Sequence, residues 1–304
     1  MKNNESSLTS LVSAFSRAYH VKEDHPIIFN DYIAQDFLSP EEYRAISTNM
    51  SNGIAFFSSE MAKKLKGNNE AILKWVTQIQ LSPTPLARAA YAEKVVLNEC
   101  RLGAEQYVIL GAGLDTFSWR HDSLKNVIVY EVDHPSTQSF KLERLQQAGH
   151  EIPPHLKFVA MDFMKELSLE KLVAAGFDLS KKTVFSLLGV TYYLTKDVFQ
   201  QLIHAFFKDL PKGSSIIFDF ADEHLFTETG IFNRVQNMVQ MAQASGEPMK
   251  FASSLSDLEK SLANEQLLIY EHLSPQEIQN QYFSNRDDNL QAFETIHYIH
   301  AVKN

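Results

Sequence analysis

The stretch YVILGAGLDT, residues 107–116, decides the fold of this chain. Residues 108–110 have the β-branched and apolar side chains of a strand that is buried on both faces. Gly111 and Gly113 end this run, and a glycine-rich turn lets a ligand approach both the main chain and the N-terminus of the next helix. The stretch predicts a ligand-binding turn or, as the simpler alternative, a tight connection between a strand and a helix.

Buried strands of this kind recur along the chain. Apolar runs follow one another at intervals of roughly 20 to 35 residues, with helical stretches between them. The predicted strands are residues 107–110, 127–132, 157–161, 183–190 and 215–220, and the segments QLLIYEHL and IHYIHAVK near the C-terminus have the character of two more. Because strands that alternate with helices form βαβ units, we predict an α/β fold with a mostly parallel sheet and ligands at the carboxyl ends of its strands.

Helical patterns dominate the regions outside these strands. Residues 9–80 show helical spacing of apolar side chains without a clear strand, and a break with two prolines then leads into a helix that we expect to end near Leu102. We predict an N-terminal helical cap over residues 1–85 and a second domain over residues 86–304. A long helical insertion at about 221–253 interrupts the second domain and is predicted to form a lid.

The composition excludes several classes of function. The 304 residues include 28 Lys and Arg against 37 Asp and Glu, with a formal net charge of −9, so the clustered positive charge of a nucleic-acid surface is absent. Cys100 is the one cysteine, which excludes an intramolecular disulfide and a cysteine-built metal site. The first ten residues lack the apolar core of a signal peptide, and no apolar run is long enough for a membrane span. We expect a cytoplasmic protein.

Acidic residues end the second predicted strand. Glu131 and Asp133 lie two residues apart and project from the same face of a regular strand. Asp133 is nearer the strand end, where a carboxylate can accept hydrogen bonds from both ribose hydroxyls of a nucleoside. A solvated strand end is the alternative for either acid. A dinucleotide site would require a third glycine where the chain has Thr116, which disfavours a nicotinamide cofactor.

Four motifs in register give the chain a family resemblance. QYVILGAGLDTFSWR, YEVDHPSTQSFKLERL, FVAMDF and LLGVTYYLT occur in the order and spacing of the leucine carboxyl methyltransferase family, and over residues 9–304 the chain resembles its bacterial O-methyltransferase members. The resemblance implies a class I fold of methyltransferases that depend on S-adenosylmethionine (SAM). This fold has a Rossmann-like sheet, here with N-terminal helices and an inserted helical lid. Since a fold fixes no chemistry by itself, the cofactor follows from the resemblance.

The resemblance also implies which residues bind the cofactor. They are Arg88, Gly111, Gly113, Asp133, Asp162 and Phe163. By this likeness the two glycines lie along the methionyl part of SAM, Asp133 binds ribose, and Arg88 forms a paired fork with the carboxylate. The Asp162 carboxylate and the main-chain N–H of Phe163 match the donor and the adjacent acceptor on one edge of adenine. A solvated helix position is the alternative for Arg88, and a core aromatic is the alternative for the Phe163 ring.

The predicted methyl acceptor is a carboxylate or a hydroxyl of a small molecule. Eukaryotic family members place a glutamate where this chain has Leu188, so a role of that glutamate cannot be transferred. The D/N-P-P-Y type of loop, which many amino-group methyltransferases use to hold a planar nitrogen, is absent after the fourth strand. Two tyrosine hydroxyls stand there instead and are donors suited to an oxygen acceptor.

Candidate contacts to the acceptor are Arg17, Tyr19, Tyr192, Tyr193 and Arg286. Packing or a surface contact is an equal alternative for each of them, and no catalytic residue or metal ligand is assigned. Two other functions share the glycine turn: a nicotinamide-dependent oxidoreductase, and a catalytically silent module that binds SAM.

Overall fold

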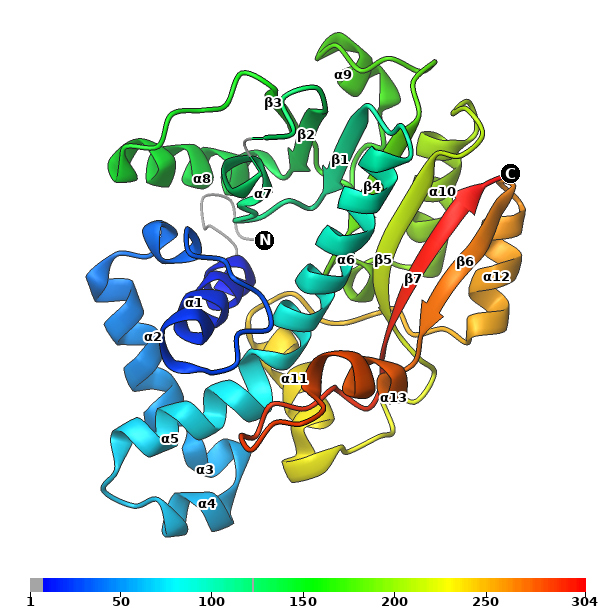
Figure 1. Ribbon diagram of the computed structural model, residues 1–304. Helices are drawn as coiled ribbons and strands as arrows, with labels where there is room; N and C mark the ends of the chain where they lie inside the picture. The colour runs from blue at the N-terminus through cyan, green and yellow to red at the C-terminus, as the bar shows by residue number, and fades with distance from the viewer. Residues whose placement is uncertain (1–7, 122) are drawn as a thin grey trace.

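A seven-stranded sheet forms the centre of the molecule (Figure 1). The computed structural model describes residues 8–121 and 123–304. The first seven residues of the predicted cap, which include most of the ten residues considered for a signal peptide, therefore lie outside the described part of the chain. The strands are β1 (Gln106–Leu110), β2 (Ile128–Asp133), β3 (Leu156–Ala160), β4 (Thr183–Leu187), β5 (Ser215–Ala221), β6 (Leu267–Leu273) and β7 (Ile296–Lys303).

The order of the strands is β3-β2-β1-β4-β5-β7-β6. The first five strands pair in parallel, whereas β7 is antiparallel to both β5 and β6. The predicted α/β fold with a mostly parallel sheet is therefore confirmed. One strand was predicted too long: β4 ends at Leu187, because Gly189 has a positive φ of 69° and leaves the extended conformation.

Helices cover both faces of this sheet and the carboxyl ends of its parallel strands. The α-helices are α1 (Leu8–Glu23), α2 (Pro40–Asn52), α3 (Ile54–Phe57), α4 (Ser59–Lys64), α5 (Asn69–Val76), α6 (Pro83–Arg101), α7 (Phe117–Arg120), α8 (Pro135–Ala148), α9 (Leu169–Ala174), α10 (Lys196–Phe207), α11 (Arg234–Ala244), α12 (Leu255–Ala263) and α13 (Pro275–Ile278). Shorter turns are η1 (Ala34–Phe37), η2 (Thr77–Leu81), η3 (Thr191–Tyr193), η4 (Ile231–Asn233) and η5 (Gln279–Phe283). None of the helices within the described residues combines the length and apolar character needed to cross a membrane.

Aromatic side chains fill the core between the sheet and α10. Phe185 of β4 lies with its ring centroid 6.2 Å from that of Phe206 and 4.8 Å from that of Phe207, and Phe177 packs beside it at 6.2 Å. Phe185, Phe206 and Phe207 are fully buried. Because strands in the middle of a parallel sheet are covered on both faces, their apolar runs are continuous, which is why the sequence revealed them.

The N-terminal helices lie at the carboxyl ends of the parallel strands (Figure 1). Buried Asp31 connects them to the turn after β1, since its carboxylate accepts hydrogen bonds from Arg17 at 2.6 Å and from Thr116 at 2.7 Å. The predicted domain boundary at residue 85 falls in the first turn of α6, and the division into a cap and a second domain stays a prediction.

The inserted segment is only partly helical. Between Ala221 and Ser253 the chain forms η4 and the 11-residue helix α11, with irregular backbone on both sides. Gly230 and Gly246 have positive φ values of 67° and 81° at the two borders, which explains why the predicted long helix is interrupted. Val235 on α11 is fully buried in the main core, so this helix is packed against the domain.

Replacing Phe185 with Ala should lower the free energy of unfolding by about 3–5 kcal/mol, because the change removes a fully buried ring and leaves a cavity. Denaturant unfolding followed by circular dichroism measures this loss. Val173→Ala on α9 is the control, since Val173 is 45% exposed and its truncation should change stability by less than about 0.5 kcal/mol. Equal effects of the two substitutions would contradict the assignment of the core.

Candidate active site

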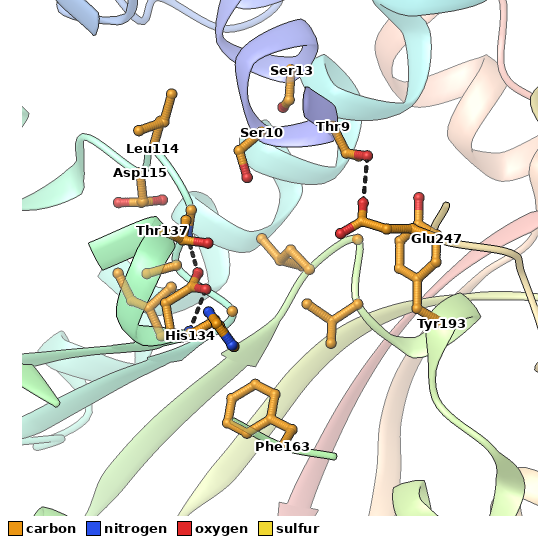
Figure 2. A pocket seen from close by; sticks show the side chains of 18 of the residues that line it. Thr9, Ser10, Ser13, Leu114, Asp115, His134, Thr137, Phe163, Tyr193 and Glu247 are labelled. Carbon is orange, nitrogen blue, oxygen red and sulfur yellow. Dashed lines mark hydrogen bonds between the residues drawn. The ribbon is translucent and has the colours of Figure 1, made fainter. Parts of the chain in front are cut away.

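A cavity of about 560 Å³ opens at the carboxyl ends of β1, β2 and β4, beneath α1 (Figure 2). This volume is in the range of small-molecule sites. Its walls come from α1, from α6, from the loops that follow β1 to β4, and from the loop after α11. The lining residues are Thr9, Ser10, Ser13, Arg17, Pro85, Arg88, Ala89, Ile109, Gly111 to Asp115, Asp133, His134, Thr137, Met161 to Lys165, Leu188 to Val190, Tyr193, Leu194, Gly246 to Pro248, and Lys250.

The glycine turn after β1 forms one wall of this cavity. Gly111 and Gly113 have φ values of 74° and 52°, in the left-handed region that favours glycine. A Cβ atom on Gly111 would lie 2.3 Å from a methyl group of Val190, and one on Gly113 would lie 3.0 Å from the hydroxyl of Ser10. The turn therefore has no side chain at these two positions and packs closely against Val190 and Ser10. The next helix, α7, has four residues and contributes little dipole.

Asp133 lies at the end of β2 and lines the cavity. Its carboxylate accepts hydrogen bonds from the main-chain N–H of Gly113 at 2.5 Å and of His134 at 2.6 Å. Burial raises the pKa of Asp133, although these two hydrogen bonds oppose the rise. Each carboxylate oxygen has two lone pairs, so both oxygens retain accepting capacity for a ligand.

Glu131, the other acid of this strand, does not line the cavity. Its side chain is buried and forms an ion pair with Lys141 at 2.5 Å. The alternative of a solvated strand end therefore applies to neither acid, and Asp133 is the one that the structure brings to the cavity.

Asp162 and Phe163 form the far wall, in the loop after β3. The Asp162 carboxylate lies 3.0 Å from Lys165 and 3.7 Å from His134, and it accepts a hydrogen bond from the N–H of Met164 at 3.1 Å. Burial would raise the pKa of Asp162, but the hydrogen bonds from Lys165 and Met164 outweigh it and lower the pKa overall. Asp162 is therefore a charged hydrogen-bond acceptor at neutral pH. Phe163, the next residue, lies at the bottom of the cavity in the view of Figure 2.

Arg88 reaches the cavity from α6. Its side chain is only 17% exposed, and its Nη1 lies 3.2 Å from the Asp219 carboxylate in the middle of the sheet. The guanidinium also rests against the bare Cα of Gly189. The alternative of an ordinary solvated arginine is therefore excluded for this residue.

Two of the five predicted acceptor contacts, Arg17 and Tyr193, line the cavity. Arg17 is bound within the protein, since it donates to Asp31 at 2.6 Å and to the carbonyl of Leu114 at 2.8 Å. Tyr193 lies beside Glu247 at the opposite end of the cavity from His134 and Leu114 (Figure 2).

The other three predicted contacts lie elsewhere in the fold. Tyr19 packs in a core cluster with Phe15, at a centroid distance of 6.0 Å, because apolar spacing on α1 turns it inward. The Tyr192 hydroxyl donates to the buried Asp219. Arg286 binds Asp288 at 2.5 Å and the carbonyl of Pro26 at 2.6 Å. None of the three lines the cavity, which corrects their expected position.

Several lining residues were not found from the sequence, including Thr9, Ser10, His134 and Glu247. The Thr9 hydroxyl donates to the Glu247 carboxylate at 2.8 Å, between residues 238 positions apart. No local pattern marks such a pair, because the fold alone brings the two segments together. His134 directly follows Asp133, and its position next to the strand end was the available signal.

Known proteins with similar sequences and structures define the family. The profile described as leucine carboxyl methyltransferase matches residues 10–207. A Bacillus subtilis protein named "Putative S-adenosyl-L-methionine-dependent methyltransferase YktD" is 58% identical over the full length of both chains. A similarly named Mycolicibacterium paratuberculosis protein is 25% identical over 81% of this chain and 76% of its own. A crystal structure of a DUF574 family protein from Streptomyces avermitilis has the same fold, with a TM-score of 0.60, 13% identity and 99% of each chain covered.

The chain belongs to the leucine carboxyl methyltransferase family, as its motifs indicated. It is a SAM-dependent methyltransferase, and the predicted cofactor and fold are confirmed at this level. The individual contacts to SAM stay predictions.

Replacing Asp133 with Asn should raise the dissociation constant of SAM more than tenfold. The amide keeps the shape of the side chain but loses a charged acceptor, and charge-assisted hydrogen bonds contribute about 1.5–3 kcal/mol each. Isothermal titration calorimetry measures the change, with Asp178→Asn as the control because the Asp178 carboxylate accepts hydrogen bonds from Ser180 in a surface turn and does not line the cavity. An unchanged dissociation constant would place the ribose contact on another residue.

Proposed function

We propose that this member of the leucine carboxyl methyltransferase family transfers the methyl group of SAM to oxygen, in a carboxylate or a hydroxyl of a small molecule. The observation that carries the proposal is Tyr193, a half-buried tyrosine that lines the end of the cavity away from His134. The polar pair Thr9 and Glu247 lies at the same end, and the apolar side chains of Leu188, Val190 and Leu194 also line the cavity.

The other end of the cavity fits SAM in its chemistry. Asp133 is the acceptor for the ribose hydroxyls, and Asp162 with the N–H of Phe163 matches the edge of adenine. The glycine turn at Gly111 and Gly113 lines the cavity without side chains, so the methionyl chain can lie along its main chain. When bound, SAM supplies an electrophilic methyl group on its sulfonium. The tasks left to the protein are to hold the acceptor in line with that methyl group and to exclude water.

Tyr193 is suited to orient an oxygen acceptor. Burial raises the pKa of Tyr193 to about 12, so its hydroxyl stays protonated at neutral pH. A protonated hydroxyl donates a hydrogen bond, and a donor to one oxygen of a carboxylate directs the other oxygen toward the cofactor. An alkylammonium group has no lone pair at neutral pH and therefore cannot accept this hydrogen bond.

The two kinds of oxygen acceptor place different demands on the site. A carboxylate is ionised at neutral pH and needs only positioning, whereas a phenol, with a pKa near 10, benefits from a base. Glu247 is the carboxylate at this end of the cavity, and the Thr9 hydroxyl holds it at 2.8 Å. The small volume, about 560 Å³ for cofactor and acceptor together, favours a small acceptor over a protein C-terminus.

With methyl-labelled SAM and a panel of acids, phenols and amines, the label should appear in a base-labile ester or a base-stable aryl ether. Mass spectrometry of the products before and after mild alkali separates the two. Label found only on nitrogen or carbon would refute transfer to oxygen. Absence of S-adenosylhomocysteine release with every acceptor would favour a silent SAM-binding module, and heat of binding with NADH would favour an oxidoreductase.

Tyr193→Phe should lower kcat about tenfold and leave the dissociation constant of S-adenosylhomocysteine within twofold, because the ring stays and the hydroxyl that contacts the acceptor and Thr9 is lost. Steady-state kinetics and calorimetry test the two halves of this expectation. Tyr270→Phe is the matched control, since Tyr270 is 78% exposed on β6 and outside the cavity. Loss of cofactor affinity without loss of kcat would move Tyr193 to the cofactor end.

A further inference from the structure

Asp219 is a buried carboxylate in the middle of the sheet that the cofactor and acceptor roles above leave unused. It lies on β5 and has no exposed surface. A carboxylate that is shielded from water requires hydrogen-bond donors from the protein. Removing one of its partners leaves a buried charge unpaired and lowers the stability of the fold. Its donors therefore show which parts of the fold depend on it.

Three donors from two segments, the loop after β4 and helix α6, converge on this carboxylate. One oxygen accepts the main-chain N–H of Gly189 at 2.6 Å, and the other accepts the hydroxyl of Tyr192 and Nη1 of Arg88 at 3.2 Å. The main-chain carbonyl of Asp219 also accepts the hydroxyl of Thr191 at 2.5 Å. Asp219 thus fixes the loop after β4, which borders the cavity, and the one cation that reaches the cavity from α6.

Gly189 provides the surface against which the Arg88 guanidinium packs. A Cβ atom at residue 189 would lie 2.4 Å from Nη1 and 2.6 Å from Nη2 of Arg88. The guanidinium therefore lies flat over the glycine, with Asp219 on one side. A guanidinium has five N–H donors in a fixed plane, and Asp219 takes one of them, so the orientation of this plane decides where the remaining donors point.

We infer that Asp219 is a positioning residue for cofactor binding. It orients Arg88 toward the carboxylate of the methionyl group, and it couples this contact to the loop of residues 188–193 at the acceptor end. The inference rests on the cofactor role proposed for Arg88. It is independent of whether the methyl acceptor is an oxygen atom, because its test needs no turnover.

The test compares two ligands that differ in the amino-acid part alone. S-adenosylhomocysteine carries the carboxylate, and 5′-methylthioadenosine has the same adenine, ribose and thioether without it. In Asp219→Asn, one oxygen remains for the N–H of Gly189, while an amide NH₂ replaces the acceptor that faces Arg88. We expect the dissociation constant of S-adenosylhomocysteine to rise at least tenfold and that of 5′-methylthioadenosine to change less than twofold.

Two further variants keep the inference open to refutation if the first is poorly folded. Gly189→Ala displaces the guanidinium and leaves Asp219 in place, so it should give the same selective loss. In an Arg88→Ala background, Asp219→Asn should cause no additional selective loss, because the two residues act in series. Ser186→Ala, which removes a buried hydrogen bond to Tyr107 on the neighbouring strand, is the control and should not discriminate between the ligands. Equal losses for both ligands, or additive effects of the Arg88 and Asp219 changes, would overturn the inference.

Discussion

The reversal of strand order between β1 and β4 is the constraint from which the site follows. The chain leaves β1 toward β2 on one side and later returns to β4 on the other, so the loops at these carboxyl ends diverge and leave a crevice. The hydrogen bond from the N–H of Gly113 to Asp133 joins the ends of β1 and β2 on one side of this crevice. The cofactor-binding residues proposed here lie on α6, at the end of β2, and in the loops that follow β1 and β3.

Buried carboxylates tie the outer parts of the molecule to this crevice. Asp31 holds the N-terminal helices to the turn after β1, Glu131 holds α8 through Lys141, and Asp219 holds α6 through Arg88. Removing charges from water costs several kcal/mol for each ion, so these pairs contribute little net stability. Their effect is on geometry, because each carboxylate holds a buried cation from another part of the chain in a defined position.

The sequence could predict the parts of the fold that depend on local pattern. The strands were found because the central ones are covered on both faces and have unbroken apolar runs, and the helix end expected near Leu102 agrees with α6, which ends at Arg101. The insertion was predicted with too much helix, because helix-compatible residues such as those around Phe232 lie in irregular backbone there. Tyr19 and Arg286 were assigned to the acceptor site although their partners, Phe15 and Asp288, lie only four and two residues away, because local spacing does not show whether such a pair faces a cavity. The pairing of Thr9 with Glu247 had no sequence signal at all, since only the fold brings the two ends of that bond together.

The hydrogen bond between Thr9 and Glu247 also connects two distant parts of the chain. It joins α1 to the loop after α11, the two walls that face each other across the cavity. A hydrogen bond to a carboxylate contributes about 1.5–3 kcal/mol, so breaking it changes the population of a state by roughly one to two orders of magnitude. The same loop is anchored more firmly at its other end, where the N–H groups of Lys250 and Phe251 donate to the carbonyl of Tyr192. The loop after α11 is therefore held at both ends, and it links the N-terminal helix α1 to the main chain of η3 in the loop that follows β4.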